Sequence, residues 1–464
     1  MNDPASRLHA LTNEARLKRN VLVNLVAFAL PAIAALISIP VLARGLGPSR
    51  FGLLTFSWGA FAIFSLFDFG VARALTRLVA VRLADNLDHE VADLLWSASW
   101  FLWALTGAIA IVGIVAAPYL VTHFMKVDAA LQREAVGVLR LLALGLPFLA
   151  HSLAMRGMLE AAQEFRLSAR LRVPLGVVTY AGPLVAIPFG ADARVAVGII
   201  VLGRVAYWLA HFFVLGHVVP GLARPRPLHR ASIRELANVG RWIFVSNVIA
   251  PALANVDRIA IAMAFPIAVS GWYGTAAEVA TKQQLFTGAL QPVFFPAFAA
   301  AYNSSPERAV ALMWRATKVT LVVLFASALV LAAFSAPLLH LWMRSAYSPV
   351  AAQVLPWLAI AIFVNSLSTV PIATLQGAID PKGVGLMFLL ELPLYVAMLV
   401  IFGRTWGVLG VALAYLGRML VDAVGQWGFL AVRFPASRPA VRRTAVYGGS
   451  AIIVLVAAAL LAAQ

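Results

Sequence analysis

Amide and charged side chains recur within a long apolar stretch just past the middle of the sequence. Asn247, Asn255 and Arg258 fall on one face of a predicted helix, and Asp257 lies beside that face. Because adjacent residues point in different directions around a helix, Asp257 and Arg258 cannot pair well with each other. An ionisable group in hydrocarbon is costly and normally faces water or a charged partner. The pattern therefore predicts that Arg258 faces a polar cavity and has a functional role there.

The next predicted helix carries a second charged pair. Glu278 and Lys282 are four residues apart, which fits an internal ion pair and equally fits a position facing the same cavity as Arg258. Asn24 places a further amide in the first apolar stretch. The predicted substrate-binding residues of this cavity are Arg258, Lys282, Asn247, Asn255 and Asn24. Together they predict a polar, partly cationic cleft.

Three acidic residues inside predicted helices are candidates for coupling transport to ion movement: Glu278, Asp257 and Glu391. Glu391 stands alone in an apolar helix, where it is either a proton site or a neutral, hydrogen-bonded carboxyl. In the following helix, Arg418 and Asp422 are four residues apart. That spacing favours an ion pair within a single helix.

Motifs for covalent chemistry do not occur in the sequence. It has no Cys, its eight His are scattered, and it contains neither a GxxxxGK[ST] loop nor an HExxH pair. We therefore expect no catalytic residues, no metal site and no cofactor. A membrane-embedded glycosyltransferase or polymerase would also need a large outer loop with clustered charges. The longest predicted outer loop, 118–135, offers only Lys126, Asp128, Arg133 and Glu134.

The composition shows which solvent surrounds these residues. Of 464 residues, 62% are hydrophobic and 12% are charged, and the mean hydropathy is +0.89. Soluble domains carry about 25% charged residues. Because too few charged side chains are present to cover a soluble surface, lipid must be the main solvent.

Thirteen apolar stretches reach the length of about 20 residues that a membrane-spanning helix needs. The first six are 20–43, 51–70, 94–117, 136–158, 173–191 and 195–219. The others are 239–264, 271–300, 312–337, 351–376, 384–403, 407–432 and 444–463. If the N-terminus is cytoplasmic, cytoplasmic ends and loops hold 22 Lys and Arg, and the opposite loops hold 7. This bias predicts that orientation.

A basic segment at 220–238 divides the chain into two halves of six spans. Both halves begin on the cytoplasmic side, which predicts parallel repeats related by an axis along the membrane normal. The predicted domains are an N-terminal lobe (1–219), a basic cytoplasmic linker (220–238), a C-terminal lobe (239–432) and a basic loop with an additional transmembrane helix (433–464). The predicted fold is an all-α polytopic membrane protein, with two six-helix lobes around a central cavity and about 12–14 transmembrane helices.

Several motifs are typical of one family. They are the LGPSRFG turn (46–52), the DFGVARALTR segment (68–77) and the GVLGVALA stretch (407–414). With the two-lobe layout and the basic central segment, they extend over nearly the whole chain. The sequence resembles the polysaccharide or O-antigen flippases of the multidrug/oligosaccharidyl-lipid/polysaccharide exporter superfamily. The family core has twelve spans, and some relatives carry two more, so a thirteenth span departs from the pattern.

The resemblance implies a function. Such a flippase moves a polyprenyl-pyrophosphate-linked oligosaccharide to the outer leaflet of a bacterial inner membrane, for O-antigen or exopolysaccharide synthesis. Its partners would be that lipid-linked glycan, membrane lipid, and the polysaccharide polymerase and glycosyltransferases of the same pathway, with no nucleic acid. Family members use cationic lumen residues for the headgroup, a role that position and chemistry assign here to Arg258 and Lys282. Two alternatives stay open: a cation-coupled multidrug exporter of the same superfamily, and a membrane-embedded glycosyltransferase or polymerase.

Overall fold

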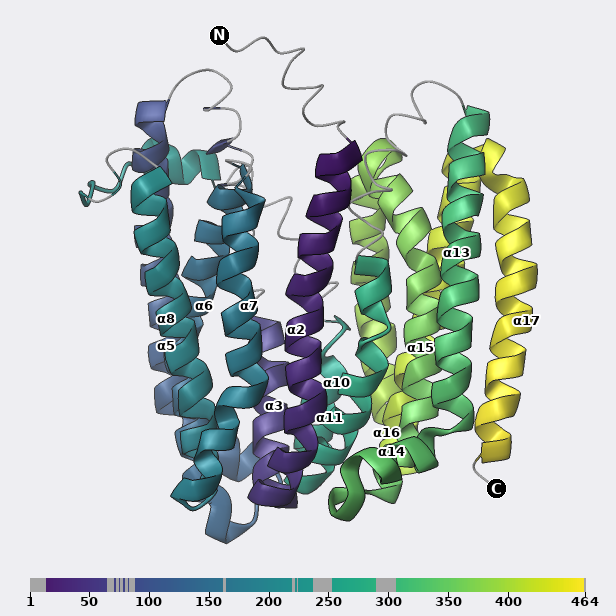
Figure 1. Ribbon diagram of the computed structural model, residues 1–464, viewed down its shortest axis with the longest axis horizontal. Coiled ribbons are helices and arrows are strands. Elements are labelled where there is room, and N and C mark those ends of the chain that lie inside the picture. Colours follow the sequence, from purple (N-terminus) through teal and green to yellow (C-terminus); the bar gives the residue numbers. More distant parts are fainter. Residues whose placement is uncertain are drawn as a thin grey trace. The chain divides into compact units, whose positions relative to one another are not determined.

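The computed structural model describes residues 14–64, 88–161, 164–218, 224–236, 253–288 and 306–462, with six isolated positions between these ranges. Within them the chain is helical, apart from turns, short loops and one isolated bridge between Lys126 and Pro266 (Figure 1). Nine of the described helices are long and apolar enough to cross a membrane. In lipid, a helix satisfies every backbone hydrogen bond within its own segment. The expectation of an all-α polytopic membrane protein is therefore confirmed.

The long helices follow one another along the chain with short connections. They are α2 (Glu14–Leu46), α5 (Asp88–Phe124), α6 (Gln132–Ala161), α7 (Phe165–Ala181) with the 3-10 helix η3 (Gly182–Phe189), α8 (Ala193–Val218), α13 (Pro306–Ala333), α15 (Pro349–Thr374), α16 (Pro381–Arg433) and α17 (Arg438–Ala462). The shorter helices are α3 (Pro48–Phe64), α10 (Val256–Ala264), α11 (Ile267–Thr281) and α14 (Ser335–Met343), with single turns η2 (Ala129–Leu131), η4 (Arg344–Ala346), η5 (Leu375–Ile379) and η6 (Pro435–Ser437).

Most predicted spans coincide with these helices, including the last one, which is α17. Three of them are described only in part. The predicted spans 51–70, 239–264 and 271–300 correspond to α3, α10 and α11, and the remaining residues of these spans lie largely outside the described ranges. For these three, the full crossing stays a prediction.

Helix α16 contains two crossings that meet at Gly407. This glycine has φ 62° and ψ −138°, a backbone conformation that side chains with a Cβ rarely adopt. Beyond it the chain runs back along itself, so that Gly417 faces the sulfur of Met398. The predicted spans 384–403 and 407–432 are therefore confirmed as two helices that form a hairpin.

The open end of this hairpin is closed by one carboxylate. Asp380, which precedes α16, accepts a hydrogen bond from the backbone N–H of Gly383 at 2.9 Å. It also pairs with Arg433, the last residue of α16, at 2.9 Å. One side chain thus caps the first helix and ties it to the end of the second.

By their internal contacts, the residues form two compact units. The first comprises 1–39, 64–117 and 137–244, and the second comprises 40–63, 118–136 and 245–464. The second unit thus includes two segments from the first half of the sequence. The division into lobes at 1–219 and 239–432 stays a prediction.

The first unit has an apolar core in which α5, α6 and α8 contribute Leu102, Met155 and Leu215. Two histidines, His151 and His211, lie within this unit's interior. His151 is 2.6 Å from the hydroxyl of Ser99 through Nε2. This contact gives His151 a packing role.

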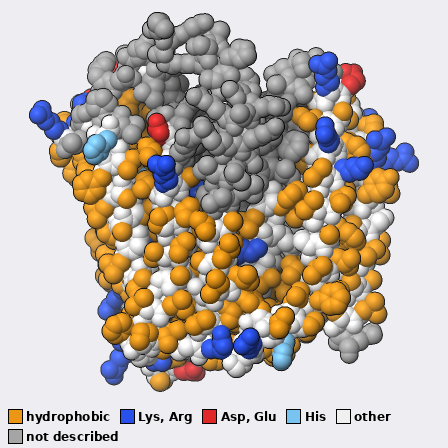
Figure 2. Space-filling view, in the orientation of Figure 1, with side chains coloured by type: hydrophobic (Ala, Val, Ile, Leu, Met, Phe, Trp, Pro, Cys, Tyr) orange, Lys and Arg blue, Asp and Glu red, His pale blue; other side chains and the backbone are white. Residues whose placement is uncertain are grey.

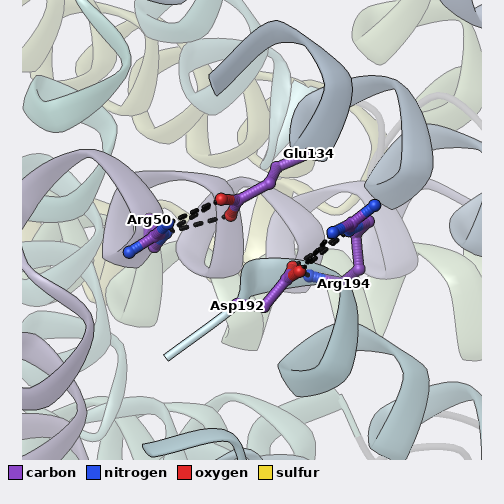
Figure 3. Close-up of polar contacts among 4 residues, drawn as sticks. All are labelled: Arg50, Glu134, Asp192 and Arg194. Atoms are coloured by element: carbon purple, nitrogen blue, oxygen red, sulfur yellow. Dashed lines mark hydrogen bonds and ion pairs between the residues drawn. The ribbon is translucent and has the colours of Figure 1, made fainter. Parts of the chain in front are cut away.

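At the start of α8, the carboxylate of Asp192 accepts a hydrogen bond from the backbone N–H of Arg194 at 2.7 Å. It also pairs with the guanidinium of Arg194 at 2.5 Å (Figure 3). Asp192 therefore caps the helix that begins with the next residue.

In the second unit, α3 packs unusually closely against α11. A Cβ at Gly52 would overlap the backbone carbonyl of Ile267, and one at Gly274 would lie 2.7 Å from Thr55 Cβ. The Thr55 hydroxyl donates to the carbonyl of Ser270 at 2.9 Å. Small residues let helix backbones approach in a membrane, and a hydroxyl then adds a hydrogen bond between them.

The beginning of α3 is held by a bidentate ion pair. The Arg50 guanidinium contacts both carboxylate oxygens of Glu134, with its shortest distance 2.7 Å from Nη2 to Oε1 (Figure 3). Arg50 comes from the first turn of α3, and Glu134 from the first turn of α6. Two parallel N–H···O bonds fix both distance and orientation. The pair therefore sets the position of α3, which reaches the charged cluster described below.

The close approach of α3 to α11 predicts that Gly52→Ala destabilises the protein. The added methyl must displace the backbone at Ile267, and overpacking of this kind costs about 1–3 kcal/mol. We expect a lower free energy of unfolding in SDS titrations of the purified protein in micelles. The matched control is Gly428→Ala, because a Cβ at this exposed glycine meets no atom within 4 Å. Equal stability of the two variants would contradict the tight contact.

Candidate functional site

Two basic side chains in the second unit share one buried carboxylate. Arg258 on α10 contacts Glu278 Oε1 through Nη2 at 3.3 Å and Nη1 at 3.4 Å. Lys282, directly after α11, contacts the other oxygen, Oε2, at 3.0 Å. The Glu278 side chain is 7% exposed, Arg258 is 13% exposed and Lys282 is 33% exposed. These three residues, which we call the α10–α11 cluster, carry two positive charges and one negative charge.

The backbone around Arg258 explains its position. Helix α10 begins at Val256, after Asn255 leaves the helical conformation with φ −132° and ψ −1°. The backbone carbonyl of Asn255 accepts a hydrogen bond from the N–H of Arg258 at 3.2 Å. On α3, Gly59 leaves room for the arginine stem, because a Cβ there would lie 2.8 Å from Arg258 Cδ. The guanidinium is thereby directed toward Glu278.

The break at Asn255 corrects one part of the predicted pattern. The shared face of Asn255 and Arg258 assumed one continuous helix, whereas the helical hydrogen bonding restarts between them. The amide of Asn255 therefore marks a helix N-terminus rather than a position within a stripe. Asn247 lies outside the described residues. Asn24 lies on α2, and the structure describes its backbone but not its side chain. Their place in a cavity stays a prediction.

Asp257 contacts the neighbouring helix α11 through its carboxylate. Its side chain is 4% exposed, and its Oδ2 accepts a hydrogen bond from the Tyr273 hydroxyl at 2.5 Å. Tyr273 comes from α11 and is itself buried. This carboxylate is held inside the protein against an aromatic partner.

Glu391 is not isolated in the folded protein. Across the α16 hairpin, its Oε2 lies 3.4 Å from Nε of Arg418, and both side chains are at most 7% exposed. The predicted partner of that arginine, Asp422, accepts a hydrogen bond from Gln426 at 3.2 Å. Arg418 interacts electrostatically with Asp422, as the four-residue spacing predicts, and forms its direct ion pair with the carboxylate that the hairpin brings from the facing helix. Glu391 also interacts with Asp422, and its role in ion coupling stays a prediction.

Two amides beyond Lys282 were not singled out by sequence. Gln284 Nε2 donates to Asn365 Oδ1 on α15 at 3.4 Å, and the Gln284 side chain is exposed. Asn365 is an amide within an otherwise apolar predicted span, which is the signal that could have identified it. This hydrogen bond joins the segment after Lys282 to α15.

Among the described residues, no group of three or more His, Asp or Glu could hold a metal ion. What the α10–α11 cluster can do is bind an anion. Arg258 supplies a planar set of N–H donors, and Lys282 supplies a more mobile ammonium. Without a ligand, Glu278 contacts both cations and compensates one of their two charges.

Comparison with known proteins places this arrangement in a family. A family model described as polysaccharide biosynthesis protein matches residues 17–302. A protein of Shigella flexneri with the name "Putative O-antigen transporter" is 24% identical over 418 residues, which covers 88% of this chain and 96% of that protein. The resemblance stated from the sequence motifs is thus confirmed.

Solved structures show a shared fold. An inward-facing multidrug resistance MATE family transporter of the MOP superfamily superimposes with a TM-score of 0.74 at 16% identity, covering 90% of this chain and 99% of that one. A MOP superfamily transporter from Pyrococcus furiosus gives a TM-score of 0.64 at 15% identity, covering 91% and 96%. The fold is therefore that of MATE and MOP transporters. Because the family model matches more than half of its length, this multi-pass membrane protein belongs to the polysaccharide biosynthesis protein family.

Proposed function

We propose that this chain is a flippase for a polyprenyl-pyrophosphate-linked oligosaccharide in a bacterial inner membrane. It would work by alternating access with its N-terminus in the cytoplasm, and supply surface polysaccharide synthesis beside a polymerase and glycosyltransferases. Family membership and the transporter fold support transport rather than covalent chemistry. The observation that carries the proposal is the α10–α11 cluster, in which two cations share one buried carboxylate.

A pyrophosphate headgroup needs such a site. Burying an unpaired ion in hydrocarbon costs many kcal/mol, so the headgroup crosses only where charges and donors replace its water. Arg258 matches phosphate oxygens with its planar fork, and Lys282 adds a point charge nearby. The polyprenyl chain needs no charged or hydrogen-bonding site, because it stays in lipid.

Glu278 gives the cluster a way to release its cargo. In the empty state its carboxylate accepts from both Arg258 and Lys282. When a pyrophosphate binds, it pairs with these two cations in place of Glu278. When the substrate leaves, Glu278 forms its ion pairs again. The competing carboxylate thus lowers affinity but keeps the site from trapping an anion, which a carrier must avoid.

We further propose that the membrane potential drives export. With the cytoplasm negative, each negative charge carried outward gains about 2.3 kcal/mol per 100 mV. The pyrophosphate linkage carries such charges, and the sequence has no GxxxxGK[ST] loop for nucleotide hydrolysis. Proton coupling through Glu278, Asp257 or Glu391 is the rival.

We expect Arg258→Ala to block translocation. Losing a charge-assisted hydrogen bond to phosphate weakens binding by about 1.5–3 kcal/mol, which corresponds to roughly tenfold to a hundredfold. The measurement is the inner-leaflet accumulation of lipid-linked glycan in cells, normalised to the amount of protein in the membrane. The control is Arg404→Ala, which removes an exposed arginine of α16. Normal translocation in Arg258→Ala would show that Arg258 is not part of the substrate-binding site.

Glu278→Gln should separate binding from turnover. Without the competing carboxylate, Arg258 and Lys282 hold a pyrophosphate more tightly, while release slows. We expect a lower Kd for a short-chain polyprenyl pyrophosphate in detergent and a lower translocation rate in vesicles. Glu90→Gln is the control, because Glu90 is 44% exposed and pairs with Arg82 in the other unit. Weaker binding by Glu278→Gln would contradict the competition.

The driving force can be tested in vesicles containing the purified protein. We expect a potential set by a potassium gradient and valinomycin, outside positive with respect to the protein's cytoplasmic side, to accelerate outward transport without any pH gradient. Strict dependence on a pH gradient would instead establish proton coupling and reject the potential as sole driver.

A further inference from the structure

Helices α13 and α17 of the second unit pack together and leave a cavity of about 610 Å³ between them. Its lining includes Trp314, Lys318 and Phe325 from α13, and Arg443, Tyr447 and Ala451 from α17. A second cavity of about 550 Å³ shares Arg443 and Tyr447 and adds Arg438 and Arg442. We call these joined cavities the α13–α17 groove. Their size lies in the range of sites that hold small ligands.

One end of the α13–α17 groove is strongly basic. Lys318, Arg442 and Arg443 are exposed, and no ion pair joins them to an acidic side chain in the part of the chain that the structure describes. Figure 2 shows Lys and Arg side chains gathered over the upper ends of α13 and α17, above a hydrophobic surface. An uncompensated set of cations beside a cavity is complementary to an anion.

Aromatic rings connect the basic end to the apolar part. The Arg443 guanidinium lies 5.7 Å from the Trp314 ring centroid. The rings of Trp314 and Tyr447 are 5.9 Å apart at an interplanar angle of 36°. Trp and Tyr prefer the depth of lipid headgroups, where one side of the ring is wet and the other apolar. The rings therefore place the basic end at the membrane–water boundary.

The rest of the groove is apolar, and some of its side chains are exposed on the outer surface of the two helices. Val322 is 63% exposed and Tyr447 is 57% exposed. Phe325 and Ala451 continue the lining one to two turns deeper on the two helices. In a membrane such surfaces face hydrocarbon chains, so the groove offers a path for a chain that begins at the basic end.

We propose that the α13–α17 groove binds an anionic phospholipid of the surrounding bilayer. Lys318, Arg442 and Arg443 hold the phosphate, and the acyl chains follow Val322 and Phe325 into the hydrocarbon. The chemistry selects headgroups with net negative charge. A choline headgroup would bring an ammonium close to the same cations, so phosphatidylglycerol binds more tightly than phosphatidylcholine. This inference does not depend on the proposed flippase activity.

Native mass spectrometry of the full-length protein in detergent tests the proposal. We expect the first phosphatidylglycerol to bind more tightly than phosphatidylcholine. Each basic residue near a membrane surface strengthens anionic lipid binding by about fivefold, so Lys318→Gln with Arg443→Gln should weaken it by about 25-fold. The matched control is Arg133→Gln with Arg404→Gln, two exposed arginines outside the groove. Equal affinity for the two lipids, or equal weakening in both double variants, would overturn the proposal.

A competition experiment shows whether the groove binds a phospholipid or free inorganic phosphate. An excess of inorganic phosphate should leave phosphatidylglycerol bound, because the acyl chains supply the rest of the affinity. Displacement of the lipid by inorganic phosphate would show that the groove takes the free anion, which also overturns the proposal.

Tryptophan fluorescence locates the lipid independently of charge. Phosphatidylglycerol brominated near the start of its acyl chains should quench the protein more than brominated phosphatidylcholine does. We expect most of this difference to disappear in Trp314→Phe and to persist in Trp100→Phe, which removes a Trp of the other unit that is 44% exposed. An unchanged difference in Trp314→Phe would place the lipid elsewhere and reject the groove.

Discussion

The free-energy cost of a charge in hydrocarbon governs how the ionisable residues of this protein are arranged. Two buried carboxylates in the described helices contact cationic side chains: Glu278 contacts Arg258 and Lys282, and Glu391 contacts Arg418. A buried ion pair is weak support for stability, since desolvation offsets much of the attraction. Removing one partner, however, leaves an uncompensated charge. These ion pairs therefore fix the positions of charged side chains and contribute little net stability.

The α10–α11 cluster depends on close packing at a distance from its charges. Gly52 and Gly274 bring α3 against α11, and Gly59 leaves the space that the Arg258 stem occupies. The ion pair between Arg50 and Glu134 fixes the start of α3. Small residues and one bidentate contact thus determine where a guanidinium points. The cationic site is a property of this packing as much as of the residues that carry the charge.

Much of the fold could be predicted from sequence because apolar runs of membrane length have few alternatives to helix. The contact of Lys282 with Glu278 also followed from their spacing. Contacts across helices could not be predicted: Arg258 and Glu278 are 20 residues apart, and Arg418 reaches Glu391 through the hairpin. Their registers depend on tertiary packing, which periodicity does not specify. The break at Asn255 was missed for a similar reason, because a single polar residue in an apolar run gives no distinct signal for a helix end.

The hairpin at Gly407 has a consequence for biogenesis. Its first helix carries Glu391 and its second carries Arg418, and neither charge tolerates lipid alone. If the two helices left the translocon one after the other, the first would expose its carboxylate to acyl chains until its partner was synthesised. The pair therefore has to be released into the bilayer as one unit, with the insertion machinery retaining the earlier segment until the later one emerges from the ribosome.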